Sequence, residues 1–205
     1  METELLATFD EKHQKTGENS REFVHKKGLW HETFHCWFVH FEKGLPQIYF
    51  QQRSNLKKDF PNLFDITAAG HLLANETVND GIREVKEELG INLSMNDLHS
   101  IGIVKDRIFN AEFIDNEFAH TYLYIMKTEN LPFRLQQEEV AGIYAAALSE
   151  VTKLYEQQID HIILKCISSD ANIAQITVKL NDFVPHGIGY MEQVLNAIRQ
   201  IGGAI

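Results

Sequence analysis

The segment 70–91, GHLLANETVNDGIREVKEELGI, constrains the fold of this chain more than any other stretch. If residues 77–89 form a helix, Glu84, Glu87 and Glu88 lie at i, i+3 and i+4 on one face. Carboxylates placed so close together repel one another by a few tenths of a kcal/mol per pair unless a cation lies among them. Oxygen ligands, several of them anionic, suit Mg²⁺ or Mn²⁺ better than zinc. The segment therefore predicts a helix that carries a divalent-metal site.

The residues around the glutamates support such a helix. Thr77 or Asn79 can cap its start, Asp80 adds negative charge near the first turn, and Gly90 can end it in a left-handed conformation. Gly81 is the one weak residue, because glycine costs about 1 kcal/mol relative to alanine inside a helix. An apolar stripe at helical spacing should face the core while the glutamates face a cleft; it consists of Val78, Ile82, Val85 and Leu89.

The same segment resembles the Nudix box: a glycine, five residues, a glutamate, seven residues, then Arg-Glu-apolar-x-Glu-Glu-x-Gly-apolar. Gly70, Glu76 and residues 83–91 match, but only six residues separate Glu76 from Arg83. In the family this Glu and Arg form an ion pair that braces the loop against the helix, so the shortening bears on that pair. The resemblance implies an α/β protein with the Nudix fold, a mixed β-sheet in an α/β/α sandwich. It also implies that the Gly70 carbonyl is a metal ligand.

The alternative is an ordinary helix with a solvated acidic face, which is the usual meaning of glutamates at this spacing. For that alternative to hold, the flanking glycines, Arg83 and the apolar positions must all match the box by accident. We therefore favour the metal-binding interpretation.

Composition narrows the class of protein and its partners. A chain of 205 residues is long enough for one domain with its own core. We expect residues 1–205 to form a single Nudix domain, with 1–22 as an N-terminal arm and 149–205 as a helical C-terminal extension. A net charge of −10 argues against nucleic acid as a partner. An anionic small molecule would need a local cationic site, provided by a metal or by a basic patch.

The ends and the cysteines predict a cytoplasmic protein. The first residues are acidic where a signal peptide is basic, and no run is long enough to cross a membrane, so no membrane partner is expected. The chain has only two cysteines, Cys36 and Cys166, which are far apart in sequence and show no zinc-binding spacing. Few, unpaired cysteines are typical of proteins in a reduced compartment. The oligomeric state stays open, with a homodimer as one alternative.

Patterns along the chain predict the order of the elements. Aromatic and β-branched residues predict a hairpin of strands 33–40 and 47–51, with Lys43 and Gly44 in its turn. A short run at 64–69 leads into the box. Later strands are expected at 99–106, 117–127, 142–148 and 175–180. A helical apolar period runs from Ser149 to Cys166, and a last amphipathic helix is expected at 187–201.

A second, narrower resemblance involves the histidines. Residues 21–71 look like the amino-terminal part of the type I isopentenyl-diphosphate isomerases, a branch of the same superfamily. Those enzymes hold a second metal with two histidines, a third histidine that follows a glycine, and two acids on a later strand. The corresponding residues, a candidate second metal site, are His25, His31, His71, Asp115 and Glu117. We interpret five other histidines as structural or surface residues: His35, His40, His120, His161 and His186.

Isomerisation itself is disfavoured by one position. In the isomerases a cysteine just before the Gly-His acts on the alkene carbon, whereas here that residue is Ala69, which cannot donate or accept a proton. The isomerases also carry a degraded box, but all three glutamates are present here. The residues that activate water on a phosphate are thus complete, and those that protonate carbon are not.

We therefore predict a metal-dependent hydrolase, a Nudix diphosphohydrolase with Mg²⁺ or Mn²⁺ as cofactor and a small organic diphosphate as substrate. The catalytic residues would be Glu84, Glu87 and Glu88, with Glu84 the most plausible to orient water. Alternative bases are Glu117, Glu138 and Glu139. Candidate phosphate-binding residues are Arg53, Lys57 and Lys58.

The sequence does not identify the non-phosphate part of the substrate. Candidate aromatic walls, which are also typical of core packing, are Trp30, Trp37, Phe60, Phe64 and Phe113. Two alternative functions are an isopentenyl-diphosphate isomerase-like enzyme and a non-catalytic ligand-binding Nudix domain.

Overall fold

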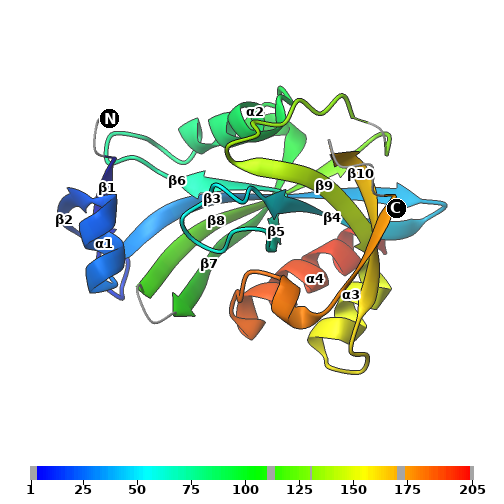
Figure 1. Cartoon of the computed structure of the whole chain (residues 1–205). Coiled ribbons are helices and arrows are strands. Elements are labelled where there is room, and N and C mark those ends of the chain that lie inside the picture. Colours follow the sequence, from blue (N-terminus) through cyan, green and yellow to red (C-terminus); the bar gives the residue numbers. More distant parts are fainter. Residues whose placement is uncertain (1–3, 110–113, 130, 170–173, 204–205) are drawn as a thin grey trace.

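A computed structural model of the chain describes residues 4–109, 114–129, 131–169 and 174–203. One mixed sheet runs through the molecule (Figure 1). Its strands are β1 (Leu5–Phe9), β2 (Lys15–Ser20), β3 (Trp30–Glu42), β4 (Leu45–Arg53), β5 (Phe64–Ile66), β6 (Ala68–His71), β7 (Leu98–Phe109), β8 (Ile114–Met126), β9 (Val140–Ala147), β10 (Ile162–Ser169) and β11 (Gln175–Val178). The helices are α1 (Arg21–Lys27), α2 (Arg83–Leu89), α3 (Leu148–Tyr155) and α4 (Ile188–Gly202), with single turns of 3-10 helix at Asp80–Ile82, Met95–Asp97 and Leu180–Asp182.

Strand β3 is the centre of the sheet. It pairs in parallel with β8 along its length, and antiparallel with β6 at one end and β4 at the other. The longest path through the sheet is β11-β10-β9-β4-β3-β1-β2. Because a parallel pair needs a long connection, the chain passes through β4, β6, α2 and β7 before it returns as β8. That excursion places α2 beside the strand end where β6 meets β3.

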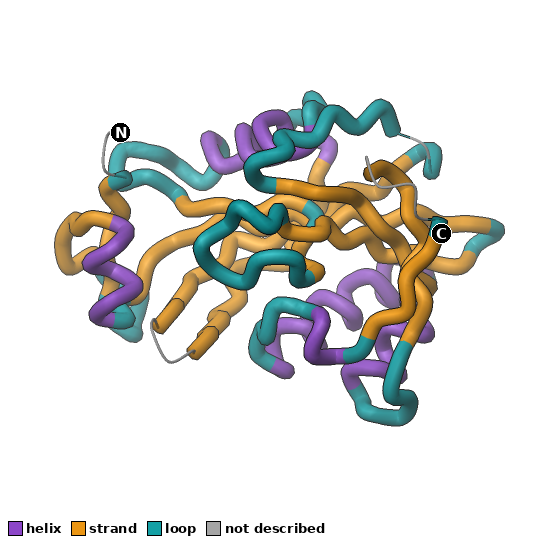
Figure 2. The backbone as a smooth tube through the Cα atoms, in the orientation of Figure 1, coloured by secondary structure: helices purple, strands orange, loops and turns teal. Residues whose placement is uncertain are grey.

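Helices cover both faces of the sheet, with α2 on one side and α3 and α4 on the other (Figures 1 and 2). Each face has its own apolar cluster. On the α2 side, Phe34 and Phe38 of β3 pack with Val85 and Leu89. On the other side, Trp37 of β3 belongs to the cluster that also contains α3 and α4 residues. This arrangement confirms the predicted α/β/α fold.

The segment 77–89 begins as a turn and a 3-10 helix rather than as α-helix, and α2 itself has seven residues. Thr77 donates to Asp80 through both its backbone N–H and its hydroxyl, which holds the start of this segment. Gly81 is required here, because a Cβ at that position would lie 2.6 Å from Cβ of Phe34. The residue that weakens the helix therefore lets its first turn approach β3.

Two predictions about the ends of the chain were wrong. Residues 5–20 of the expected arm form the β1–β2 hairpin, which adds to the sheet because Thr8 and Phe9 pair with His31 and Trp30 (Figure 2). The extension 149–205 is only partly helical. Residues 162–169 form β10, because the open edge of β9 offers backbone partners to that strand, and β11 follows.

The predicted hairpin at 33–51 is confirmed, with longer strands on both sides of the Lys43-Gly44 turn. The strands expected at 99–106, 117–127, 142–148 and 175–180 are present as β7, β8, β9 and β11. The last helix also agrees with its prediction within a residue. Among the described helices, none is both long and apolar enough to span a lipid bilayer.

Candidate active site

A cleft of about 480 Å³ opens where α1, β6, α2, β8 and the loop before α4 meet. Among the described residues its lining contains nine carboxylates but only four Arg and Lys side chains. An anionic substrate could not enter such a site unless further positive charge were present. The electrostatics of the cleft thus call for cations.

One wall is built by the box. A Cβ at position 70 would overlap the side chain of Glu84, so the glycine lets this carboxylate lie directly on the β6 backbone. Burial raises the pKa of Glu84 to about 7, and the nearby Glu87 adds to this, although Arg83 opposes it. A carboxyl group with this pKa can accept or release a proton near neutral pH.

Glu88 is more deeply buried than its two neighbours on α2. Its side chain accepts hydrogen bonds from the Ala69 N–H at 3.2 Å and from Gln51 Nε2 at 3.3 Å. Burial, together with the charge of Glu84, raises its pKa well above the usual value. Glu87 differs, because its side chain is 53% exposed at the rim of the cleft.

Arg83 lies among these carboxylates. Its Nη1 is 2.5 Å from Glu84 Oε1 and 3.0 Å from Glu87 Oε2. In the described part of the chain, the three glutamates are not among the groups whose ligand atoms all lie within 4.8 Å of one another. All three line the cleft, as the helical spacing predicts. Glu84 and Glu87 are paired with Arg83, whereas Glu88 accepts its hydrogen bonds from other residues.

The shortened box still contains its ion pair. Arg83 Nε lies 2.6 Å from Glu76 Oε1, and Nη2 lies 3.0 Å from Glu76 Oε2. Glu76 also accepts the N–H of Leu73, and Arg83 donates to the carbonyl of His71. The two-pronged contact braces the loop against α2 despite the missing residue.

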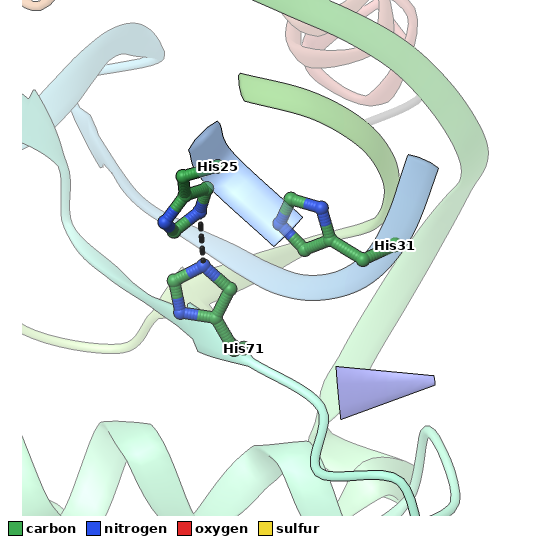
Figure 3. A group of neighbouring side chains, drawn as sticks. All are labelled: His25, His31 and His71. Atoms are coloured by element: carbon green, nitrogen blue, oxygen red, sulfur yellow. Dashed lines mark hydrogen bonds between the residues drawn. The ribbon is translucent and has the colours of Figure 1, made fainter. Parts of the chain in front are cut away.

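The five residues of the predicted second site lie close together, and all of them except His31 line the cleft. His25 comes from α1, His31 from β3, His71 from β6, and Asp115 and Glu117 from β8. The three imidazoles face one another, and His25 Nε2 and His71 Nε2 are 3.2 Å apart (Figure 3). His31 Nε2 is 3.4 Å from Asp115 Oδ1. The ligand atoms of the three histidines, and those of His31, Asp115 and Glu117, each form a group within 4.8 Å.

The protonation of this cluster suits a metal. His31 Nδ1 lies 3.1 Å from the Leu29 carbonyl, to which it can only donate, so in the neutral ring Nε2 carries a lone pair. Among the described residues, no hydrogen bond reaches that Nε2, Asp115 Oδ1 or Glu117 Oε2, all of them buried, although His35 Nε2 lies 3.3 Å from Glu117 Oε2. When the His31 ring is neutral, lone pairs of His31 and Asp115 face each other at 3.4 Å, which is costly unless a cation lies between them.

Two pKa shifts agree with this. Burial and the neighbouring His31 lower the pKa of His71 well below its usual value, so its ring is neutral. Burial alone would raise the pKa of Asp115, but the neighbouring His25 and His31 side chains bring it below the usual value. A neutral imidazole and an ionised carboxylate, as at His71 and Asp115, are ligands that zinc or manganese accepts.

Of the three predicted phosphate ligands, two line the cleft. Arg53 donates to Asp65 at 2.7 Å and to the Asp59 carbonyl, and Lys57 is paired with Glu139. Lys58 is exposed and does not line the cleft. Its prediction as a site residue finds no support in the geometry, because its side chain leaves the loop on the solvent side.

Sequence reasoning missed a buried network beneath the cleft. His186 Nδ1 lies 2.6 Å from Asp106 Oδ2, and His186 Nε2 lies 2.8 Å from Asp65 Oδ1. Nearby, Tyr190 OH lies 2.9 Å from His35 Nδ1 and 3.0 Å from Trp37 Nε1. The structural interpretation of His35 and His186 agrees with these contacts, but both also line the cleft. No local sequence pattern joins residues so far apart in the chain.

The remaining candidate residues differ in whether they line the cleft. Glu117 and Glu139 line the cleft, whereas Glu138 is exposed outside it. Ala69 also lines the cleft. Of the aromatic candidates, Phe60 lines the cleft; Trp30, Trp37 and Phe64 are buried away from it, and Phe113 lies outside the described residues.

The fold and the box together define a Nudix protein, and comparison with known proteins agrees. A family model described as the NUDIX domain matches residues 29–165, more than half of the chain. The chain belongs to this family, which confirms the resemblance of residues 70–91.

Its relatives carry the same family name. An uncharacterized Nudix hydrolase of Clostridium acetobutylicum is 40% identical over 202 residues, which cover 97% of this chain and 98% of that protein. Nudix hydrolase 3 of Arabidopsis thaliana is 34% identical over 137 residues, 63% of this chain but 17% of the longer plant protein. The crystal structure of DR0079 from Deinococcus radiodurans has a TM-score of 0.55 at 17% identity, covering 76% of this chain and 89% of that one, and so shows the shared fold. These names support a hydrolase.

Proposed function

We propose that this protein hydrolyses the diphosphate group of a small organic diphosphate in a reaction that depends on Mg²⁺ or Mn²⁺. The observation that carries this proposal is the pair of facing walls: box glutamates on one side, and the His-Asp-Glu cluster with its unpartnered buried atoms on the other. When bound, divalent cations would polarise phosphate oxygens and neutralise the leaving group.

In this proposal the chain's own residues hold cations and position water. Glu84, Glu87, Glu88 and the Gly70 carbonyl are the ligands on the box side. Glu84, which lies on the β6 backbone and has a pKa of about 7, orients and deprotonates the attacking water. Glu117 and Glu139, which also line the cleft, are the alternative bases.

On the facing wall we propose a second cation site made by His25, His31, His71, Asp115 and Glu117. Its support is the lone-pair arrangement of His31 and Asp115. Arg53 and Lys57 are the proposed phosphate contacts at the rim. Because both side chains already have acidic partners, they would orient the substrate rather than add net charge.

The second candidate function is that of an isopentenyl-diphosphate isomerase-like enzyme. The observation that favours it is the convergence of the five histidine and acidic residues that its resemblance implies. Against it stands Ala69 at the cleft, since a methyl group cannot protonate the alkene carbon.

One assay separates the candidates. The protein is incubated with Mg²⁺ or Mn²⁺ and a panel of organic diphosphates that includes isopentenyl diphosphate, and phosphate release and alkene migration are followed in parallel. We expect metal-dependent phosphate or diphosphate release that falls by orders of magnitude in Glu84→Gln, without isomerisation. Robust isomerisation by the wild type would reverse the ranking. If the protein bound a diphosphate but released no phosphate with either metal ion, the result would favour a non-catalytic ligand-binding domain.

A further inference from the structure

A third group of histidine and acidic side chains lies outside the cleft. His13 Nε2 and His120 Nε2 are each 2.9 Å from the same oxygen, Oε1 of Glu32. The residues come from three separate segments: the turn between β1 and β2, strand β8 and strand β3. All three ligand atoms lie within 4.8 Å of one another. None of these residues lines the cleft.

We call this group the hairpin cluster. It lies on the other face of the sheet from the cleft cluster, by which we mean His25, His31, His71, Asp115 and Glu117. Successive side chains of a strand point to opposite faces. Glu32 therefore points away from its neighbour His31, and β8 runs in continuous parallel register with β3, so His120 points away from Glu117. The two clusters are consequently separate sites.

The turn holds His13 in an unusual conformation. Its φ is +64°, a left-handed value that most side chains avoid. Its ring stacks on Phe118 at a centroid distance of 4.1 Å, which directs Nε2 towards Glu32. The side chains of His13, Glu32 and His120 are 29%, 23% and 14% exposed, so the site is lined by protein yet open to solvent on one side.

We propose that His13, Glu32 and His120 form a binding site for a zinc-class transition-metal ion, distinct from the cations of the proposed hydrolytic reaction. Two imidazole nitrogens and one carboxylate oxygen are a ligand set that zinc takes with tetrahedral geometry, leaving the fourth position to water. With metal–ligand bonds of about 2.0–2.1 Å, ligand atoms stand about 3.3 Å apart. The present 2.9 Å separations reach that value with shifts of a few tenths of an ångström.

The ion would tie the β1–β2 hairpin to the sheet. At present β1 pairs with β3 through two residue pairs only, Thr8–His31 and Phe9–Trp30. A metal at the hairpin cluster adds a cross-link that closes the chain between residues 13 and 32, a segment that includes all of α1. Because α1 carries His25, the same link would hold one wall of the cleft.

The test measures zinc content and hairpin protection in the full chain. Wild type, His13→Asn, His120→Gln and His161→Gln are loaded with Zn²⁺, passed through a desalting column, and analysed for zinc per chain. Hydrogen exchange of residues 5–20 is then compared with and without zinc. Asparagine tolerates a left-handed φ, so His13→Asn keeps the turn intact. His161, a 54% exposed residue that belongs to neither cluster, controls for surface binding.

We expect His13→Asn and His120→Gln each to bind one equivalent of zinc fewer than wild type and His161→Gln, whatever the cleft cluster binds. Zinc should slow exchange of residues 5–20 in wild type and in His161→Gln, but not in the two cluster variants. Equal zinc content in all four proteins would overturn the proposal, and His13, Glu32 and His120 would then be a hydrogen-bonded clamp.

Discussion

Replacement of His186 by glutamine tests how the buried wall of the cleft is held together. The His186 side chain is 7% exposed and lies between Asp106 and Asp65, at 2.6 and 2.8 Å. Burial alone would lower its pKa, but the hydrogen bonds and charges of these two aspartates raise the pKa to about 10. His186 is therefore an imidazolium at neutral pH, and it neutralises part of the charge of two buried carboxylates.

The expected loss of stability follows from this geometry. Removal of one partner from a buried ion pair costs about 3–5 kcal/mol. The rise of the pKa from 6.5 to about 10 corresponds to a free energy on the order of 5 kcal/mol. We expect about 3 kcal/mol, because Asp65 keeps its contact with Arg53 at 2.7 Å. For a chain of this size the melting temperature should fall by about 6–12 °C.

The pH dependence has a definite sign. The pKa of His186 is higher in the folded state than in the unfolded state, so protonation favours folding. This contribution is complete below the unfolded pKa of about 6.5 and disappears as the pH rises through about 10. The difference in unfolding free energy between wild type and His186→Gln should therefore be largest near pH 6 and decrease steadily towards pH 10.

Urea unfolding at several pH values between 6 and 10 measures that difference directly. His161→Gln is the matched control, because His161 lies 2.6 Å from Asp160 in a pair exposed to solvent on both sides. Its removal should leave stability unchanged at each pH. The reasoning would be refuted if His186→Gln lost no more stability than His161→Gln, or if its loss were the same at pH 6 and pH 10.

Four further predictions concern the cleft. A methyl group in Gly70→Ala must displace Glu84, so phosphate release should fall by at least about tenfold while the far-UV circular dichroism is retained; wild-type turnover would contradict the close contact. Glu88→Gln should lose activity by orders of magnitude but melt at the same or a higher temperature, since burial already disfavours the charged form. Mg²⁺ or Mn²⁺ at 100 times its Kd should stabilise the fold by about 2.7 kcal/mol, reversibly with EDTA; no shift at millimolar metal would contradict the proposed metal sites. Ala69→Cys should show little or no isomerisation of isopentenyl diphosphate, because one thiol rarely restores a paired acid and base; rapid isomerisation would show that the thiol alone was missing.

The elements with strong local patterns were predictable from the sequence. The β3–β4 hairpin was read correctly because its strands are rich in aromatic residues, and the turn residues Lys43 and Gly44 both take positive φ. The β1–β2 hairpin was not predicted. Strand β2 has the sequence KTGENS, which has no apolar alternation, and its place comes from pairing with β1. Tertiary pairing likewise turned Ile162, Ile163 and Cys166 from a helical pattern into β10.

The site residues also fall into those that the sequence predicted and those that it did not. The box could be read because its glutamates, glycines and arginine are close in sequence, and the spacing alone places them on one helix. The cleft cluster was found through resemblance to a family. The hairpin cluster and the His186 network could be found in neither way, because His13 and Glu32 are 19 residues apart, and His186 and Asp65 are 121 residues apart. The β1–β3 and β3–β8 pairings bring His13, Glu32 and His120 together, and the return of the chain before α4 brings His186 to Asp65.

The cleft is lined by residues from almost the whole described chain, from Glu4 before β1 to His186 before α4. No contiguous fragment contains all of its walls. A partly synthesised chain that ends just after the box would contain the three histidines, but it would lack Asp115 and Glu117 of β8 and the imidazolium of His186. We therefore expect the complete cleft to form late in folding, after the apolar core around it has closed.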